Sequence, residues 1–506
     1  MQKIAIIDVG SNSARLVITQ IYSSGANNMV YNQKEALRLS QKINKNGELT
    51  EEAFTVTLDC MRSFASMCKL FDAHRIIAVA TAAIRNAVNG KKLVDVVKKE
   101  TGISLEIISG KTEAYMSYLG VINTIAVKDA VIFDLGGGST EIVLVKNRKM
   151  VQSISLPIGC VNLTSQLGIK NKMSPATAAK LKKTIAAQLA KAPWLKACGL
   201  PMIGVGGTAR SVGKIDQKRI KYYTPKIHNY QFAVQSFKNT FKYMQGTTLA
   251  ERKQIAGLSA DRADIIVAGS AIIKALADCT KAKKLIISGC GLREGLFMEY
   301  LTHNTTLPLI VKDILLSSTE RALNLYGPDI EHSHVVAKFA LTLFDAWFPL
   351  HQLDASWRRL LNTAALLHDV GITINYYSHA RHSGYMIENS RIFGVTHMEL
   401  VHAAIMAAWH NGVSRGYMRN KQYRDLLTET DMLRIAKGAL LISLAEALDY
   451  SQTQVIHSIK ASIGTKGAIL TISSPMVPSI ELHQLKQVSK WFKKAMGVPL
   501  IVKTKK

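Results

Sequence analysis

The chain has 506 residues, which is more than a single hydrophobic core usually holds, so we expect several domains. It carries 64 Lys and Arg against 36 Asp and Glu, a formal net charge of +28 with a sequence pI near 9.8. Apolar residues make up 48% and charged residues 20%, values typical of a folded chain, which argues against a disordered basic tail as the source of the charge. We therefore expect basic folded surfaces and a polyanionic partner.

The amino-terminal residues do not resemble a secretion signal. One Lys precedes a short apolar run that ends at Asp8, and no small-residue cleavage site follows. No window approaches the ~18 apolar residues that a membrane-spanning helix needs. The six cysteines form no Cys-x-x-Cys pair and are scattered through apolar stretches. We therefore expect a cytoplasmic protein with reduced thiols.

An internal repeat organises the first 150 residues. Residues 4–18 match residues 130–144 at an offset of 126 (134 − 8), and each copy reads as apolar strand, glycine-rich turn and second apolar strand. The repeat pairs Asp8 with Asp134, Gly10 with Gly136, and Ser13 with Ser139. Small turn residues let backbone amides approach phosphate oxygens, and a neighbouring carboxylate can hold Mg²⁺. A pair of purely structural hairpins remains the alternative.

Two more glycine-rich segments follow β-branched runs. Residues 202–212 and 285–296 each place glycines between a predicted strand and a predicted helix, where a helix N-terminus can face an anion. Helices and strands alternate after each hairpin. The sequence therefore predicts two α/β lobes facing a cleft.

Six motifs in one order carry a family resemblance. They are DVGSNSARL (8–16), ATAAIRNAVN (80–89), ISGKTEAYMSYLGV (108–121), DLGGGSTE (134–141), GVGGTA (204–209) and GLREGL (291–296). Together they resemble the exopolyphosphatase and guanosine pentaphosphate phosphohydrolase family of the actin-like (ribonuclease H-like) superfamily. The resemblance covers almost the whole chain and implies an α/β fold of two actin-like lobes.

The resemblance also implies roles for individual residues. Glu113 would be the general base that deprotonates water, and Arg85 would neutralise charge that develops on the phosphoryl group. Asp134 and Glu141 would hold Mg²⁺, with a further metal or water contact from Asp8. The phosphate-binding residues would be Gly10, Ser11, Asn12, Ser13, Gly136, Gly137, Gly138, Ser139, Gly206, Gly207 and Thr208. In the third motif, ISGKTEAYMSYLGV, the family commonly has two acidic residues before the alanine, whereas this chain has Thr112 and Glu113 before Ala114. For Arg85, a helix-face salt bridge remains an equal alternative.

Histidine is concentrated in the helical sequence after residue 303. Nine of the 14 histidines fall within residues 332–410. The pattern resembles the helical HD phosphohydrolase domain, in which His and Asp from separate helices bind a divalent metal. The matching positions are His332, His368, Asp369 and Asp449. The family also has histidine at the positions of His379, His382 and His410, which indicates a structural role or a contact with phosphate. We expect His334, His397 and His402 to be packed or surface residues. The alternative is that this helical domain binds no metal and serves as a lid, a dimer surface or the wall of a channel.

These observations predict four domains: lobe I (1–117), lobe II (118–302), a helical HD-like domain (303–453) and a small basic α+β domain (454–506). The function that we expect is Mg²⁺-dependent release of the terminal phosphate of inorganic polyphosphate by an exopolyphosphatase. Hydrolysis of guanosine pentaphosphate is the alternative within the same class, and a polyanion-binding scaffold is the alternative outside it. We expect a homodimer, with neither a membrane nor a nucleic acid as partner.

Overall fold

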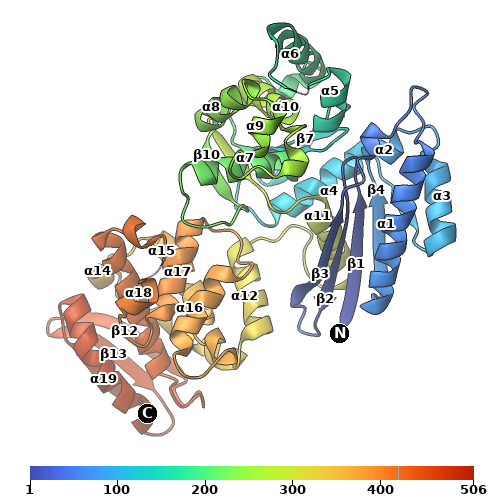
Figure 1. Cartoon of the computed structure of the whole chain (residues 1–506). Helices are drawn as coiled ribbons and strands as arrows, with labels where there is room; N and C mark the ends of the chain where they lie inside the picture. The colour runs from blue at the N-terminus through green and yellow to red at the C-terminus, as the bar shows by residue number, and fades with distance from the viewer. Residues whose placement is uncertain (170, 420, 506) are drawn as a thin grey trace. The chain divides into compact units, whose positions relative to one another are not determined.

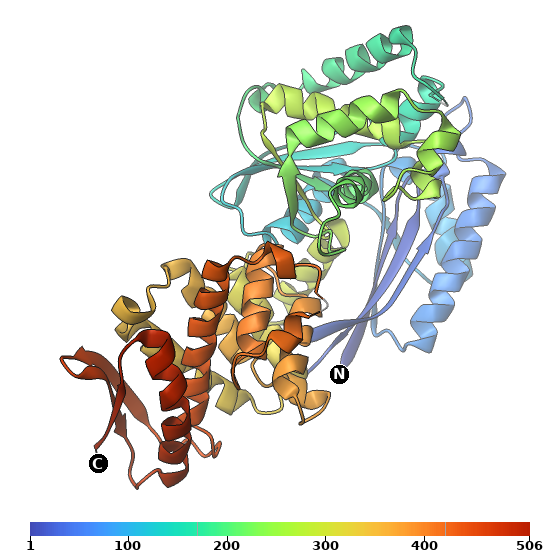
Figure 2. The same ribbon diagram turned by 60° about the vertical axis from the view of Figure 1, so that its left-hand side comes forward.

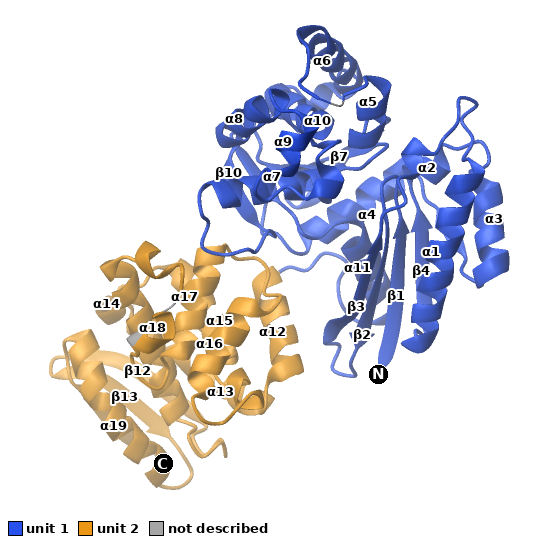
Figure 3. Ribbon diagram, in the orientation of Figure 1, with its two compact units in different colours: residues 1–312 blue, residues 313–506 orange. Residues whose placement is uncertain are grey.

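The structure is a computed structural model that describes residues 1–169, 171–419 and 421–505 (Figure 1). It divides into two compact units, residues 1–312 and residues 313–506 (Figure 3). The finer division into four domains stays a prediction. Within the described residues, no helix is both long enough and apolar enough to span a membrane. All six cysteines are free thiols, as the sequence predicts.

The first sheet of unit 1 has five strands in the order β3-β2-β1-β4-β5. The strands are β1 (Gln2–Val9), β2 (Ala14–Ile21), β3 (Asn27–Glu35), β4 (Arg75–Ala80) and β5 (Leu105–Ile107). The helices of this part are α1 (Glu51–Leu70), α2 (Ala82–Arg85), α3 (Gly90–Thr101) and α4 (Gly110–Ile122), with a 3-10 turn, η1 (Leu39–Gln41). Strand β1 is buried along most of its length because its β-branched run is covered on both faces.

The second sheet has six strands in the order β10-β11-β9-β6-β7-β8. The strands are β6 (Ala130–Leu135), β7 (Thr140–Lys146), β8 (Lys149–Leu156), β9 (Met202–Val205), β10 (Tyr230–Ala233) and β11 (Lys284–Ile287). The helices are α5 (Cys160–Gln166), α6 (Pro175–Leu189), α7 (Gly206–Arg219), α8 (Val234–Gln245), α9 (Leu249–Lys253), α10 (Ile266–Thr280) and α11 (Leu292–Asn304), with η2 (Pro193–Leu195) and η3 (Ala260–Arg262).

The two sheets repeat one arrangement, which confirms the duplication predicted from the sequence. In each, the first strand pairs with the second in antiparallel fashion and with the fourth in parallel fashion. The hairpin turns close in the same way: the Gly10 amide donates to the Ser13 carbonyl at 3.1 Å, and the Gly136 amide to the Ser139 carbonyl at 3.0 Å. The fold class of two actin-like α/β lobes is therefore correct.

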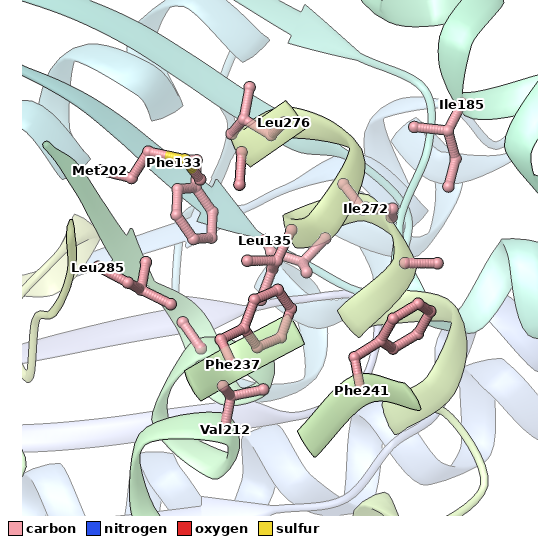
Figure 4. Packing of buried hydrophobic residues seen from close by; sticks show 14 of the residues in the cluster. Phe133, Leu135, Ile185, Met202, Val212, Phe237, Phe241, Ile272, Leu276 and Leu285 are labelled. Atoms are coloured by element: carbon pink, nitrogen blue, oxygen red, sulfur yellow. The ribbon is translucent and has the colours of Figure 1, made fainter. Parts of the chain in front are cut away.

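Apolar packing fixes both sheets. In the second sheet, the buried side chains Phe133 and Leu135 of β6 pack with two buried helix residues, Phe237 of α8 and Ile272 of α10 (Figure 4). Each such side chain stabilises the fold by roughly 1.5–3 kcal/mol relative to exposure. A separate cluster joins residues of both sheets to helices α4 and α11, with Leu119 of α4 fully buried in it. Helix α4 is thus held between the lobes.

Unit 2 is a helical bundle followed by a small sheet (Figure 2). The helices are α12 (Ile314–Tyr326), α13 (Ile330–Ala346), α14 (Phe348–His351), α15 (Ala355–Leu366), α16 (His379–Asn389), α17 (His397–Ala408) and α18 (Glu429–Ala447), with η4 (Val370–Thr373), η5 (Arg415–Met418) and η6 (Arg424–Leu426). Strands β12 (Ser458–Gly464), β13 (Gly467–Ser473) and β14 (Leu500–Lys505) form the sheet, with α19 (Ser479–Met496) before β14. Side-chain caps start several of these helices, for example Asp329 at α13 and Thr396 at α17.

Candidate active site

Helix α4 begins at the centre of the site. The Ser109 hydroxyl caps it by accepting a hydrogen bond from the Thr112 amide at 3.0 Å, which fixes the first turn and places Glu113 in it. Arg85, at the end of α2, donates to Glu113 Oε2 at 2.8 Å and to the Ile108 carbonyl at 3.0 Å. Glu113 is only 8% exposed. The structure therefore brings the predicted base and the predicted arginine together as a nearly buried ion pair.

The second hairpin supplies two more carboxylates. Asp134 of β6 and Glu141 of β7 are directly opposite each other in the antiparallel register. Ser117, one turn after Glu113 on α4, donates to Asp134 Oδ2 at 2.6 Å, and Ser155 of β8 donates to Glu141 Oε1 at 2.7 Å. One face of α4 thus meets the hairpin through both Glu113 and Ser117. The sequence did not single out either serine.

Crowding makes the ionised state of these acids costly. Burial raises the pKa of Glu141 to about 7, and the negative charge of Asp134 adds to the rise. Burial and the charge of Glu141 likewise raise the pKa of Glu113, while burial raises that of Asp134. The pKa of Asp8 rises to about 6 through burial, against the pull of the Arg293 guanidinium. Several carboxylates that disfavour one another's charge are a donor set that a hard divalent cation would stabilise.

The two predicted phosphate-binding turns face each other. A Cβ on Gly137 would lie 3.0 Å from the Ser11 Cβ, and one on Gly138 would lie 2.8 Å from the Ser11 hydroxyl. A larger residue at either position would require Ser11 or its turn to shift, so glycine suits this close approach of the two turns. The Gly10 and Gly136 amides close their own turns, so a phosphate contact at these turns would come from their other backbone or hydroxyl groups.

The fifth motif, GVGGTA (204–209), lies at the start of α7, beside Asp134. Gly206 has φ +93°, and a Cβ there would lie 2.6 Å from the Leu135 carbonyl oxygen. A Cβ on Gly207 would lie 2.0 Å from Cζ of Arg262, so that guanidinium rests directly on the helix N-terminus. Thr208 is 1% exposed, and its side chain packs against Gly269. Gly206 and Gly207 therefore flank the carboxylates, whereas the Thr208 side chain points into the lobe.

Four arginines surround the carboxylates: Arg15, Arg210, Arg262 and Arg293. Burial and the charges of Arg293 and Arg210 lower the pKa of Arg15 to about 10. Burial and the charges of Arg262 and Arg293 lower the pKa of Arg210. Like charges gathered this closely are stabilised by a polyanion. Three of the four were visible inside the motifs or just after them. Arg15 occupies the repeat position of Glu141, Arg210 begins the second turn of α7, and Arg293 is in the first turn of α11.

The histidine and aspartate residues predicted for unit 2 also come together. His332 Nδ1 lies 2.9 Å from Asp449 Oδ2, His332 Nε2 lies 3.9 Å from Asp369 Oδ2, and His368 Nε2 lies 3.6 Å from the same oxygen. His379 and His410 approach Asp369 from its other side. The remaining predictions also fit packed or surface roles: the His402 ring stacks on Trp357, and His334 approaches Glu320 at 3.4 Å near the surface.

The two-lobed fold with carboxylates and arginines at its centre is that of an actin-like phosphohydrolase. Residues 17–304 match the Ppx/GppA phosphatase family, and residues 314–488 match domain III of Ppx/GppA phosphatases. The chain belongs to the Ppx/GppA phosphatase family and is a phosphoanhydride hydrolase.

Relatives and solved structures agree with this assignment. A guanosine-5'-triphosphate,3'-diphosphate pyrophosphatase from Pseudoalteromonas translucida is 27% identical over 451 residues, which are 87% of each chain. An exopolyphosphatase structure from Cytophaga hutchinsonii is 25% identical with a TM-score of 0.56, covering 61% of this chain and 99% of the other. A Ppx/GppA family member from Aquifex aeolicus is 29% identical with a TM-score of 0.53, covering 60% of this chain and 99% of the other.

Proposed function

We propose that the protein is an exopolyphosphatase that releases orthophosphate from the end of inorganic polyphosphate in the cytoplasm. The observation that carries the proposal is the nearly buried Glu113, held by Arg85 beside the paired carboxylates Asp134 and Glu141. Around this group the four arginines supply positive charge for a substrate whose every unit is an anion. The homodimer expected from the sequence stays a prediction.

In the proposed reaction Glu113 is the general base. Its carboxylate accepts a proton from water as the water oxygen bonds to the terminal phosphorus, and the phosphoanhydride P–O bond to the rest of the chain breaks. The electron pair of that bond leaves with the shortened polyphosphate. Arg85 orients the Glu113 carboxylate through the 2.8 Å hydrogen bond and keeps it more acidic than burial alone would allow.

The carboxylates of the site fit Mg²⁺. Asp134 and Glu141 offer oxygen ligands from opposite strands, and Asp8 adds a third at the matching position of the first hairpin. A bound Mg²⁺ would neutralise charge on the phosphoryl oxygens. The Ser117 and Ser155 hydroxyls would then fix the orientation of Asp134 and Glu141, because each already donates to one carboxylate oxygen.

The same site suits guanosine pentaphosphate, which also ends in a phosphoanhydride. This alternative is favoured by the Pseudoalteromonas relative, whose name specifies that substrate class and whose match extends over 87% of each chain. The net charge of +28 favours the polymer, since each neutralised phosphate releases counterions and a long chain meets more basic residues. The intact set of Glu113, Asp134 and Glu141 speaks against a scaffold without catalysis.

A direct comparison of substrates tests the proposal. Phosphate release is measured with Mg²⁺ on long-chain polyphosphate and on guanosine pentaphosphate, at several salt concentrations. The proposal predicts a higher kcat/KM for polyphosphate, with an affinity that falls more steeply with salt than that for the nucleotide. A much higher kcat/KM for guanosine pentaphosphate would assign the alternative substrate, and binding without phosphate release from either would support a scaffold.

A further inference from the structure

Two ion pairs join the lobe built on the first sheet to the lobe built on the second. Lys34 of β3 and Arg38, just before η1, supply the cations, and Asp261 of η3 and Asp264, just after it, supply the carboxylates. Lys34 Nζ lies 2.9 Å from Asp261 Oδ2, and Arg38 Nη1 lies 3.0 Å from Asp264 Oδ2. Arg38 Nη2 also donates to the Asp261 carbonyl at 3.2 Å. Arg38 thus binds the second lobe through two contacts, and it lies outside all six sequence motifs.

The backbone around Arg38 is bonded to the first phosphate-binding turn. The Arg38 amide donates to the Asn12 carbonyl at 3.0 Å, and the Ser40 amide donates to the Ser11 carbonyl at 3.1 Å. The same segment reaches the second turn, since a Cβ on Gly138 would lie 3.5 Å from the Ser40 hydroxyl. A shift of this segment would therefore move the first turn relative to the second.

Arg38 has a backbone conformation that needs outside support. Its φ of +51° and ψ of +40° lie in the left-handed region, which residues with a side chain rarely adopt. Such a conformation persists where the surrounding structure holds it. The guanidinium of Arg38 is held by the second lobe, whereas its amide is held by the turn of the first lobe. The two sets of contacts together fix the residue in this conformation.

The carboxylates of the second lobe stand on an anchored segment. Arg252 has no exposed surface and donates through Nη1 to the Ala263 carbonyl at 3.1 Å, between the two acids. Burial raises the pKa of Asp261, but hydrogen bonds from Ser259 and Lys34 outweigh it and lower that pKa to about 2. Asp261 is therefore ionised at neutral pH and keeps its ion pair with the first lobe.

Asp264 depends on Arg38 for a partner. Within residues 1–169, 171–419 and 421–505, its Oδ1 is buried and makes no hydrogen bond. Its other oxygen, Oδ2, accepts from Arg38 Nη1. A carboxylate with one unsatisfied oxygen gains more from a cation on the other than a fully solvated one does. The pair between Arg38 and Asp264 is therefore the stronger candidate for linking the lobes.

We propose that Arg38 is a positioning residue for phosphoanhydride hydrolysis: its ion pair with Asp264 of the opposite lobe fixes the first phosphate-binding turn against the second. The proposal rests on the proposed function, in which these turns hold phosphate, and it applies to either substrate because both end in a phosphoanhydride. Arg38 acts through its backbone bond to Asn12, and a misplaced turn would move the phosphoryl group out of line with the attacking water. The side chains of the pair are 37% and 27% exposed, so the pair itself adds little to stability.

A double-mutant cycle on the full chain tests the proposal. Phosphate release with Mg²⁺ is measured on long-chain polyphosphate and on guanosine pentaphosphate for Arg38→Met, Asp264→Asn and the double variant. Each single variant should lower kcat by roughly 10-fold or more on the substrate that the enzyme hydrolyses, with little change in melting temperature. The double variant should lose no more than either single variant, since both remove one interaction. Arg38→Lys, which can still pair with Asp264, should recover part of kcat. Arg62→Met breaks ion pairs of 2.9 and 2.8 Å within the first lobe and should leave kcat unchanged.

Other results would overturn the proposal. Losses that multiply in the double variant would show that Arg38 and Asp264 act separately, and a change in KM alone would make Arg38 a substrate contact. If Arg38→Met melts far below wild type, Arg38→Gly decides, because glycine keeps the left-handed backbone without strain and lacks the guanidinium. Wild-type kcat in the glycine variant contradicts the positioning role, and a loss equal to that of Asp264→Asn supports it. Absence of phosphate release from the wild-type protein would refute the proposed function and this role together, whereas the other outcomes concern the positioning role alone.

Discussion

Replacing Arg85 separates two roles that this side chain could have. Arg85 could neutralise charge on the transferred phosphoryl group, or it could control the ionisation of Glu113. The ion pair between Arg85 Nη1 and Glu113 Oε2 spans 2.8 Å, with side-chain exposures of 18% and 10%. The same guanidinium also donates to the Ile108 carbonyl. This geometry favours control of Glu113, and Arg85→Met should show it in the pH dependence of the reaction.

The size of the effect follows from the lost interaction. A hydrogen bond to a charged group contributes about 1.5–3 kcal/mol, which corresponds to about one to two pKa units. Burial and Glu141 already raise the pKa of Glu113, and Arg85 opposes that rise. Glu113 must be deprotonated to accept a proton from water. Removing the Arg85 guanidinium should raise the pKa of Glu113 and so move the acidic limb of kcat/KM to higher pH by about one to two units. On the acidic limb, activity should fall by roughly 10–100-fold relative to wild type, and it should recover at high pH.

Phosphate release from polyphosphate, measured between pH 5 and 10, provides the assay. Arg85→Lys is the matched control, because it keeps a positive charge near Glu113 and should shift the limb less. A loss of the same factor at every pH, with the acidic limb of wild type, would refute control of Glu113 and assign Arg85 to the phosphoryl group.

Two other substitutions test the support of the site and the arginine cluster. Gly120→Ala would place Cβ 2.1 Å from the Gly291 carbonyl oxygen, where α4 meets α11, and should lower the free energy of unfolding by about 1–3 kcal/mol in thermal melts. Gly246→Ala, whose Cβ would have its nearest neighbour at 3.6 Å, should change it little, and equal effects would argue against crowding as the cause. Arg210→Met should raise KM for long polyphosphate and reduce the slope of log KM against log salt by about one, by analogy with phosphate contacts in nucleic-acid binding. Arg219→Met, on the same helix but 54% exposed, should leave both values unchanged, and an equal change would show that the cluster has no special part in binding.

The sequence revealed the parts of unit 1 that repeat. Asp8 and Asp134 could be matched because both follow an apolar strand and precede a turn of small residues, a pattern set by local chemistry. Ser117 and Ser155 could not be found in this way, because their contacts with Asp134 and Glu141 depend on how α4 and β8 pack against the hairpin. A serine within a helix or strand has many ordinary uses, and only packing shows which one applies.

Unit 2 shows the same limit. The pattern of His332, His368 and Asp369 predicted a metal site, because a His-Asp pair with an upstream His in helical sequence is uncommon. The approach of His379 and His410 to the second oxygen of Asp369 requires the relative placement of three separate segments of the bundle, which no local spacing encodes. The arginines of unit 1 likewise converge from strands and helices that are far apart in sequence.

The replacement Glu113→Gln tests the central claim of this account most directly. Glutamine keeps the size of the side chain but cannot accept the proton of the attacking water. With Mg²⁺ and long-chain polyphosphate, the variant should lose phosphate release by several orders of magnitude while its affinity for polyphosphate, measured by equilibrium binding, stays close to that of wild type. Phosphate release at the wild-type rate would contradict the assignment of Glu113 as the base.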